Sequence, residues 1–138
     1  MKVIALRGDV STGKSHVINI VYQFLLQDGW VQVPTHFRIL GNPAYEDIID
    51  ILQKGAQTIG VIGAGDYQIG AIALSKLLKE LELKGCDIAV CACRTNPKIE
   101  AAVNNYANHF WHDKTTSTGR ENDRIVNGID ATALFNLV

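Results

Sequence analysis

Four residues near the N-terminus, Gly8, Gly13, Lys14 and Ser15, have the types and the spacing of a site that holds phosphate groups. They fit the pattern G-x-x-x-x-G-K-[ST] within the segment GDVSTGKS. Glycines let the backbone curl so that successive N–H groups converge on phosphate oxygens at the positive end of a helix. A lysine at this position reaches terminal phosphates, and the hydroxyl that follows it is a ligand for Mg²⁺.

The elements on either side of this segment supply the context that the pattern requires. Residues 2–6 are a short apolar run, and residues 15–27 carry apolar side chains at helical spacing. The segment therefore resembles the Walker A loop of the P-loop NTPase superfamily, which implies that it binds a nucleoside triphosphate. The resemblance assigns nucleotide contacts to Gly8, Asp9, Val10, Ser11, Thr12, Gly13, Lys14 and Ser15.

A second acidic position is expected in such proteins, where an aspartate after another apolar strand holds magnesium directly or through water. Asp66 is the candidate, because it follows the run TIGVIGAG. The resemblance implies that Ser15 and Asp66 bind the metal and that Lys14 and Asp66 are the catalytic pair. Two small residues separate Asp66 from the apolar run, a departure from the family pattern. The alternative is an aspartate of a loop, or one that caps a following helix.

The order of the remaining elements predicts the fold. Strand patterns over residues 36–40, 58–63, 87–93 and 109–112 alternate with helical patterns over 44–54, 68–84, 97–107 and 120–137. With the first strand and helix, this order predicts an α/β fold: a three-layer α/β/α arrangement with a doubly wound sheet of about five parallel strands. Residues 1–138 are expected to form a single P-loop nucleotide-binding domain.

Four loops should meet where the parallel strands end, because ligands of such sheets bind beyond the carboxyl ends of the strands. These loops are residues 7–15, 63–68, 94–96 and 113–119. In nucleoside and nucleotide kinases of the superfamily, which the element order also resembles, the last of these loops often cradles the base. The guanine-reading N-K-x-D motif is missing, so adenine is favoured by elimination. The spacing of Gly8 and Gly13 separately excludes a G-x-G-x-x-G dinucleotide loop.

Two functions follow from this site, and a third alternative is a degenerate P-loop protein that binds nucleotide only structurally. The first is Mg²⁺-dependent ATP binding by a small ATPase or nucleotide-dependent switch that depends on a regulatory protein partner. The second is a kinase that transfers the γ-phosphate of ATP to a small-molecule acceptor near Asp9, His36 and Arg38. The element order favours the kinase. The absence of an acid directly after Asp66 and of an arginine-rich lid favours the switch, since only Arg94, Arg120 and Arg124 are available.

Composition excludes several other classes. The 138 residues carry a net charge of −1, with 47% hydrophobic and 20% charged residues, which is typical of ordinary globular proteins and gives no signal for nucleic-acid binding. No apolar run is long enough to span a membrane, so a cytoplasmic location is expected. Cys86, Cys91 and Cys93 are expected to be buried reduced thiols. Nothing in the sequence chooses an oligomeric state.

Overall fold

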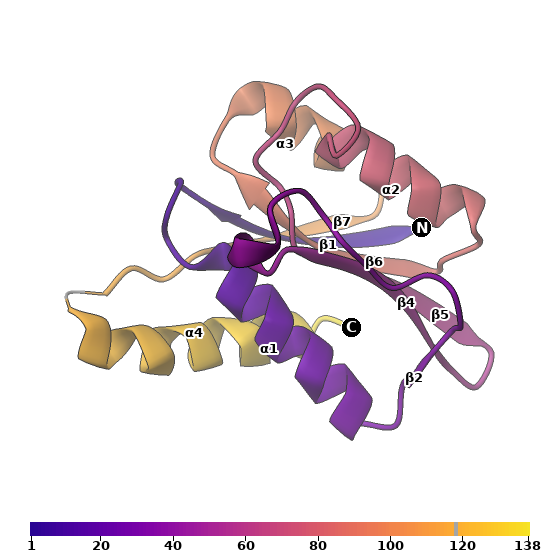
Figure 1. Ribbon diagram of the computed structural model, residues 1–138, viewed down its shortest axis with the longest axis horizontal. Helices are drawn as coiled ribbons and strands as arrows, with labels where there is room; N and C mark the ends of the chain where they lie inside the picture. The colour runs from indigo at the N-terminus through magenta and orange to yellow at the C-terminus, as the bar shows by residue number, and fades with distance from the viewer. Residues whose placement is uncertain (118) are drawn as a thin grey trace.

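The computed structural model describes residues 1–117 and 119–138, apart from the side chains of Arg120 and Glu121. In this part of the chain a mixed sheet of seven strands lies between two layers of helices, α1 with α4 and α2 with α3 (Figure 1). The elements in chain order are β1 (Lys2–Gly8), α1 (Lys14–Gln27), β2 (Val31–Gln32), β3 (Arg38–Ile39), the 3-10 turn η1 (Pro43–Tyr45), β4 (Ile48–Lys54), β5 (Gln57–Ile62), α2 (Leu74–Leu83), β6 (Ile88–Arg94), α3 (Pro97–Asn104), β7 (His109–Asp113) and α4 (Arg120–Phe135).

The centre of the sheet is parallel. The strand order is β2-β4-β5-β6-β1-β7, with β3 also paired to β4, and β5, β6, β1 and β7 run in the same direction. Strand β1 has a parallel neighbour on each side, so Ala5 lies opposite both Cys91 and Trp111. The GDVSTGKS segment therefore leaves the sheet from an interior strand, as parallel strands of a layered α/β fold require.

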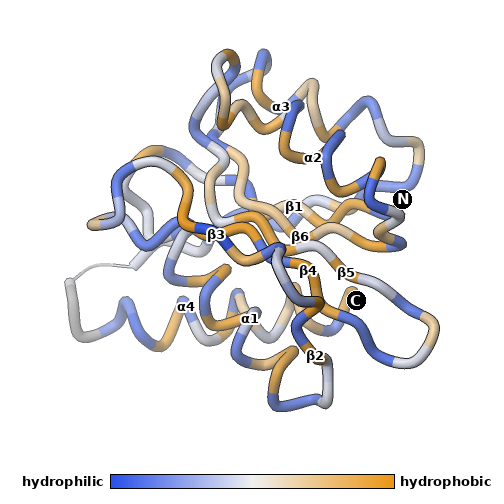
Figure 2. The backbone as a smooth tube through the Cα atoms, turned by 45° about the vertical axis from the view of Figure 1, so that its right-hand side comes forward, coloured by the Kyte–Doolittle hydropathy of each residue, from blue (hydrophilic) through white to orange (hydrophobic). Residues whose placement is uncertain are grey.

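Alternation along the strands separates two apolar cores. Val3 and Ala5 belong to the core under α2 and α3, whereas Ile4 and Leu6 belong to the core under α1 and α4. The tube in Figure 2 is accordingly apolar along the central strands and mixed along the helices. The three cysteines are buried and unpaired, as expected, and all belong to the α2 and α3 core. Burial raises the pKa of the Cys86 thiol to about 11.

The prediction of a helix over residues 44–54 was wrong. Beyond the single turn η1, this segment forms β4, which pairs antiparallel with β5 through a turn at residues 55–56. Gly55 adopts a left-handed φ of 60° in that turn, so it reverses a hairpin and does not end a helix. The run IIDIL is buried throughout, and an apolar run without period does not separate a strand from a buried helix. The sheet is therefore mixed, and the predicted set of about five parallel strands is reduced to four.

Two other boundaries differ from the prediction. The strand expected over residues 36–40 is reduced to β3, and the short strand β2 precedes it on the same edge of β4. The helix expected from residue 68 begins only at Leu74, because Gly70 has a left-handed φ of 99° and the Leu74 N–H bonds back to the Tyr67 carbonyl. Residues 67–73 form a loop beside the carboxyl ends of the parallel strands.

The predicted gathering of loops at one edge is confirmed by backbone hydrogen bonds. The Thr95 N–H donates to the Gly8 carbonyl at 3.0 Å, and the Lys114 N–H donates to the Arg7 carbonyl at 2.7 Å. The Arg94 N–H donates to the Gly65 carbonyl at 2.8 Å. A Cβ on Gly65 would lie only 1.9 Å from the backbone of β6, so only glycine permits the two segments to approach this closely. Strand β4 runs in the opposite direction, so it begins at this edge where the parallel strands end.

None of the described helices is both long and apolar enough to cross a membrane.

Candidate functional site

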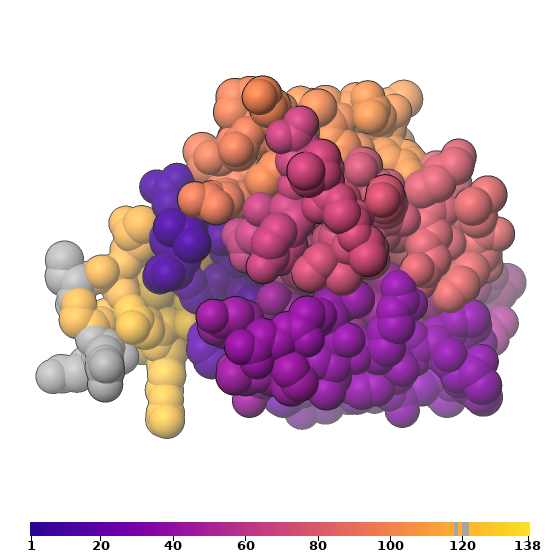
Figure 3. Space-filling model, turned by 45° about the horizontal axis from the view of Figure 1, so that its top comes forward, coloured from indigo at the N-terminus to yellow at the C-terminus, as the bar shows by residue number. Residues whose placement is uncertain are grey.

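The GDVSTGKS segment forms an open loop between β1 and α1. Ser11 and Gly13 adopt left-handed φ angles of 61° and 88°, which curl the backbone toward the start of the helix. No side chain caps the N-terminus of α1, so the N–H groups of its first turn are available to donate hydrogen bonds to an anion. Figure 3 shows the indigo loop at the surface, between the yellow residues of α4 and the magenta residues that precede β4.

Lys14 bends back over this loop although it belongs to the first turn of α1. Its ammonium donates to the Asp9 carbonyl at 2.7 Å, and it lies 3.7 Å from the Asp66 carboxylate, an ion-pair distance too long for a hydrogen bond. Burial lowers the pKa of Lys14, while the nearby Asp66 opposes this shift. The structure therefore brings together Lys14 and Asp66, the two residues that the sequence predicted as a pair.

Asp66 is incompletely paired. Its Oδ1 atom is buried and has no hydrogen-bond partner in the described part of the chain, although 38% of the side chain is exposed. Asp66 lies in the loop between β5 and α2, well before the start of α2 at Leu74. It therefore does not cap this helix, and its position agrees with the alternative of a loop aspartate. A buried carboxylate oxygen without a hydrogen-bond donor favours a cationic ligand.

Asp47 completes this side of the site, and sequence analysis missed it. The residue is buried just before β4, and its Oδ1 accepts a hydrogen bond from the Ser15 hydroxyl at 2.5 Å. Burial raises the pKa of Asp47, and the neighbouring Asp66 raises it further. An acid directly before an apolar run was the available signal, but a helical interpretation of residues 44–54 concealed it.

The oxygen atoms of Asp47, Asp66 and Ser15 are of the kind that Mg²⁺ prefers. Among the described residues no group of three or more His, Cys, Asp or Glu side chains has metal-binding geometry. The fit to magnesium therefore depends on two carboxylates and one hydroxyl, with further ligands from phosphate and water.

The opposite side of the loop is formed by residues around a buried carboxylate, Asp130 of α4. Asp130 accepts hydrogen bonds from the Thr115 N–H at 2.9 Å and the Thr115 hydroxyl at 2.6 Å, and it lies 2.9 Å from His112 and 3.2 Å from the Lys114 ammonium. Although burial opposes it, the hydrogen bonds from Thr115 and His112 hold the pKa of Asp130 below its usual value. Lys114 in turn lies against the loop, since a Cβ on Gly8 would lie 2.8 Å from the Lys114 Cβ.

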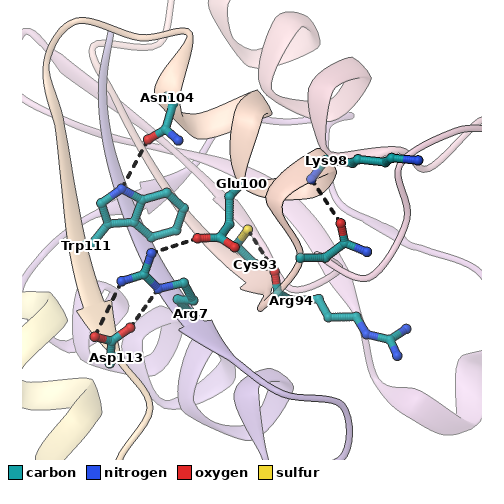
Figure 4. A network of polar contacts seen from close by, with 9 residues as sticks. Arg7, Cys93, Arg94, Lys98, Glu100, Asn104, Trp111 and Asp113 are labelled. Carbon is teal, nitrogen blue, oxygen red and sulfur yellow. Dashed lines mark hydrogen bonds and ion pairs between the residues drawn. The ribbon is translucent and has the colours of Figure 1, made fainter.

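Arg7 fixes the base of the loop, as Figure 4 shows. Its guanidinium donates to Glu100 of α3 at 2.7 Å and to Asp113 of β7 at 2.8 Å, and it lies over the Trp111 ring at 4.6 Å. Arg94 points away from this group and has no ion pair among the described residues (Figure 4). Arg94 lies opposite Gly8 in the pairing of β1 with β6, so its positive charge is near the loop and contributes to the lowered pKa of Lys14.

The other predicted residues are less involved. Asp9 is exposed and His36 is half-buried. Arg38 is held by Glu80 of α2 through two hydrogen bonds of 2.7 Å, which lower the pKa of Glu80 to about 2. Arg124 is exposed on α4. Thr118 and the side chain of Arg120 lie outside the described residues. Two surface hollows, of about 670 and 880 Å³, lie at the other edge of the sheet and contain no residue of the loop.

No family model matches this chain, and the searches of curated proteins and of solved structures gave no match.

The buried carboxylate of Asp47 gives a testable pH dependence. Because its pKa is raised in the folded state, the wild type loses stability as the pH rises through that raised value. Asp47→Asn removes the charge but retains an oxygen for the Ser15 hydroxyl. In EDTA at pH 8, we expect the free energy of unfolding of this variant to exceed that of the wild type by about 1 kcal/mol. At pH 4 this difference should be smaller. Thermal unfolding measures both.

The control for this experiment is Asp28→Asn, an exposed carboxylate paired with Lys54 on the surface. Its substitution should give no gain that grows with pH, since surface pairs contribute little. A lower stability of Asp47→Asn at both pH values would contradict the interpretation of Asp47 as an electrostatically unfavourable residue.

Proposed function

We propose that this protein binds Mg²⁺-ATP at the loop of residues 8–15 and acts as a small ATPase or nucleotide-dependent switch. The observation that supports this proposal is the convergence of an uncapped helix start, the Lys14 ammonium and two carboxylates at one edge of the sheet. The loop N–H groups and Lys14 would neutralise the phosphates. The parallel centre of the sheet, with helices on both faces, agrees with a doubly wound P-loop layout, which we include in the proposal. The cytoplasmic location stays a prediction.

Magnesium would be held by Ser15 and Asp66, with Asp47 added as a second carboxylate. Two carboxylates close together destabilise each other unless a proton or a cation lies between them. The raised pKa of Asp47 is consistent with such a cation, and so is the Asp66 Oδ1 atom, which has an ion pair with Lys14 at 3.7 Å but no hydrogen bond among the described residues. When bound, the metal would supply positive charge for the β- and γ-phosphates.

The residues that surround the loop favour slow hydrolysis. Exposed Tyr67 and Gln68 follow Asp66 where faster ATPases place an acid that activates water. Arg94 is the guanidinium near the loop that has no ion pair with a carboxylate among the described residues. A full complement of cationic groups would therefore require a partner protein, because a single arginine supplied by a partner changes the rate by about 10³- to 10⁵-fold.

One observation favours the kinase as a second candidate. In this candidate Ser15 and Asp66 alone would hold the metal, and Asp47, a buried carboxylate with a raised pKa, would be free to act as a general base. In that reaction the hydroxyl oxygen of an acceptor would bond to the γ-phosphorus and the bond to the β-phosphate oxygen would break. ADP would leave, and Asp47 would take the hydroxyl proton.

Lys14→Ala should abolish nucleotide binding. We expect the affinity for Mg²⁺-ATP to fall at least 100-fold, because the ammonium that neutralises the phosphates is lost. Isothermal calorimetry on both proteins measures the change, with circular dichroism to verify the fold. Lys79→Ala, on the exposed surface of α2, is the matched control and should bind as the wild type does. Equal affinities of Lys14→Ala and the wild type would refute the proposed function.

Asp66→Asn tests the metal. The affinity for ATP should fall about tenfold in Mg²⁺ and change little in EDTA, because the carboxylate acts through the cation. Titrations under the two conditions provide the comparison. Asp9→Asn is the control, because the Asp9 carboxylate is exposed and Lys14 donates to the Asp9 backbone carbonyl, which this substitution keeps. A defect of equal size without metal would instead make Asp66 only the ion-pair partner of Lys14.

Turnover separates the two functions. The isolated protein should hydrolyse ATP at less than about 0.1 per second, against about 1 to 100 per second for kinases with their acceptors. The measurement is ADP release, first alone and then with a panel of small hydroxyl-bearing acceptors. If one acceptor brings the rate into the kinase range, the proposal of a switch is wrong and the kinase function is supported.

A further inference from the structure

The two sides of the loop differ in chemistry, and this difference orients a bound nucleotide. On the β4 and β5 side lie the carboxylates of Asp47 and Asp66, which contact Ser15 and Lys14. On the β7 and α4 side, Lys114 lies against Gly8 and Asn127 lies against Gly13. The inference below rests on the proposed function, because it concerns the part of ATP that the loop does not hold.

The carboxylate side suits only the metal-bound end of a triphosphate. Without a cation, Asp47 and Asp66 repel phosphate oxygens, so only the end of the nucleotide that carries Mg²⁺ is stable there. Ser15, the predicted metal ligand, is hydrogen-bonded to Asp47 on that same side. The β- and γ-phosphates therefore belong beside the carboxylates, and the uncharged nucleoside belongs on the side of α4.

Asn127 is available on that side. Both polar atoms of its carboxamide lie 3.5 Å from the position that a Cβ on Gly13 would occupy, so the side chain lies beside the open face of this glycine. It is half-buried, and it takes part in none of the hydrogen bonds that join the described residues. The buried side-chain atoms without a hydrogen bond in the described part of the chain do not include those of Asn127, so its carboxamide is open to solvent. A ligand with an adjacent donor and acceptor would bond to both of its polar groups.

The surroundings hold Asn127 in a defined place. Asp130 lies about one helical turn after Asn127 on α4. Its buried carboxylate accepts a hydrogen bond from Thr115 and forms an ion pair with Lys114. The helix also packs along α1, which begins directly after Gly13. The helix that carries Asn127 is therefore fixed beside the loop, and a recognition residue needs such a rigid support.

We propose that Asn127 binds the adenine base of ATP, with its amide NH₂ donating to a ring nitrogen and its carbonyl accepting from the exocyclic amine. Adenine presents this donor and acceptor side by side, and a carboxamide matches both at once. The loop itself binds only phosphate. Asn127 is thus the residue through which the protein distinguishes ATP from an inorganic polyphosphate.

The test compares Mg²⁺-ATP with Mg²⁺-tripolyphosphate, which carries the phosphates without the nucleoside. In calorimetry, Asn127→Ala should bind ATP about tenfold more weakly than the wild type and bind tripolyphosphate equally well. The variant should fold, because alanine is the better residue in a helix. Asn105→Ala, an exposed asparagine at the other edge of the sheet, is the control and should leave both affinities unchanged.

Each other outcome overturns the inference. An unchanged affinity for ATP would remove Asn127 from the base site, and an equal loss for both ligands would make it a support for the loop. In both cases the wild type still binds, so the proposed function stands. If the wild type binds neither ATP nor tripolyphosphate, the proposed function and this inference fail together.

Discussion

The pairing of β1 with a parallel strand on each side is the constraint on which the rest of the site depends. β6 and β7 fix the direction and the height at which the chain leaves the sheet at Gly8. The loops that follow these two strands then bond to the Gly8 and Arg7 carbonyls. Arg7 adds ionic contacts to α3 and β7, so the start of the loop is held from three directions. A loop that must curl to expose its N–H groups needs such fixed ends.

Buried charge is the second feature of the site. Lys14 and Asp47 are both removed from water, and the pKa of each is shifted by burial toward the neutral form. Asp66 keeps a buried oxygen without a hydrogen bond. Such groups destabilise a folded protein unless a ligand compensates them. The electrostatic cost is concentrated where the proposed Mg²⁺-ATP would supply both the anion and the cation, whereas the carboxylate of Asp130 on the other side is already satisfied by neighbouring donors.

The sequence by itself determined the features that depend on local chemistry. The spacing from Gly8 to Ser15 and the flanking periodicities predicted the strand, loop and helix that the structure contains. Buried runs predicted the strands over residues 58–63 and 87–93, and the alternation of Cys91 and Cys93 predicted thiols on one face. Asp66 was found because it follows a strand that ends at the site edge. Each of these inferences needs only the chain's direction and the period of its side chains.

Only the tertiary structure decided the direction of β4 and the neighbours of α4. A buried apolar run has no period that separates strand from helix, and the turn at Gly55 reads equally as a helix end. Antiparallel pairing with β5 then places the start of β4 at the edge where the parallel strands end, and this brings Asp47 to Ser15. Asn127 reaches Gly13 from more than a hundred residues away because α4 packs along α1. These contacts join distant segments, and packing between distant segments is not encoded in the pattern of any one of them.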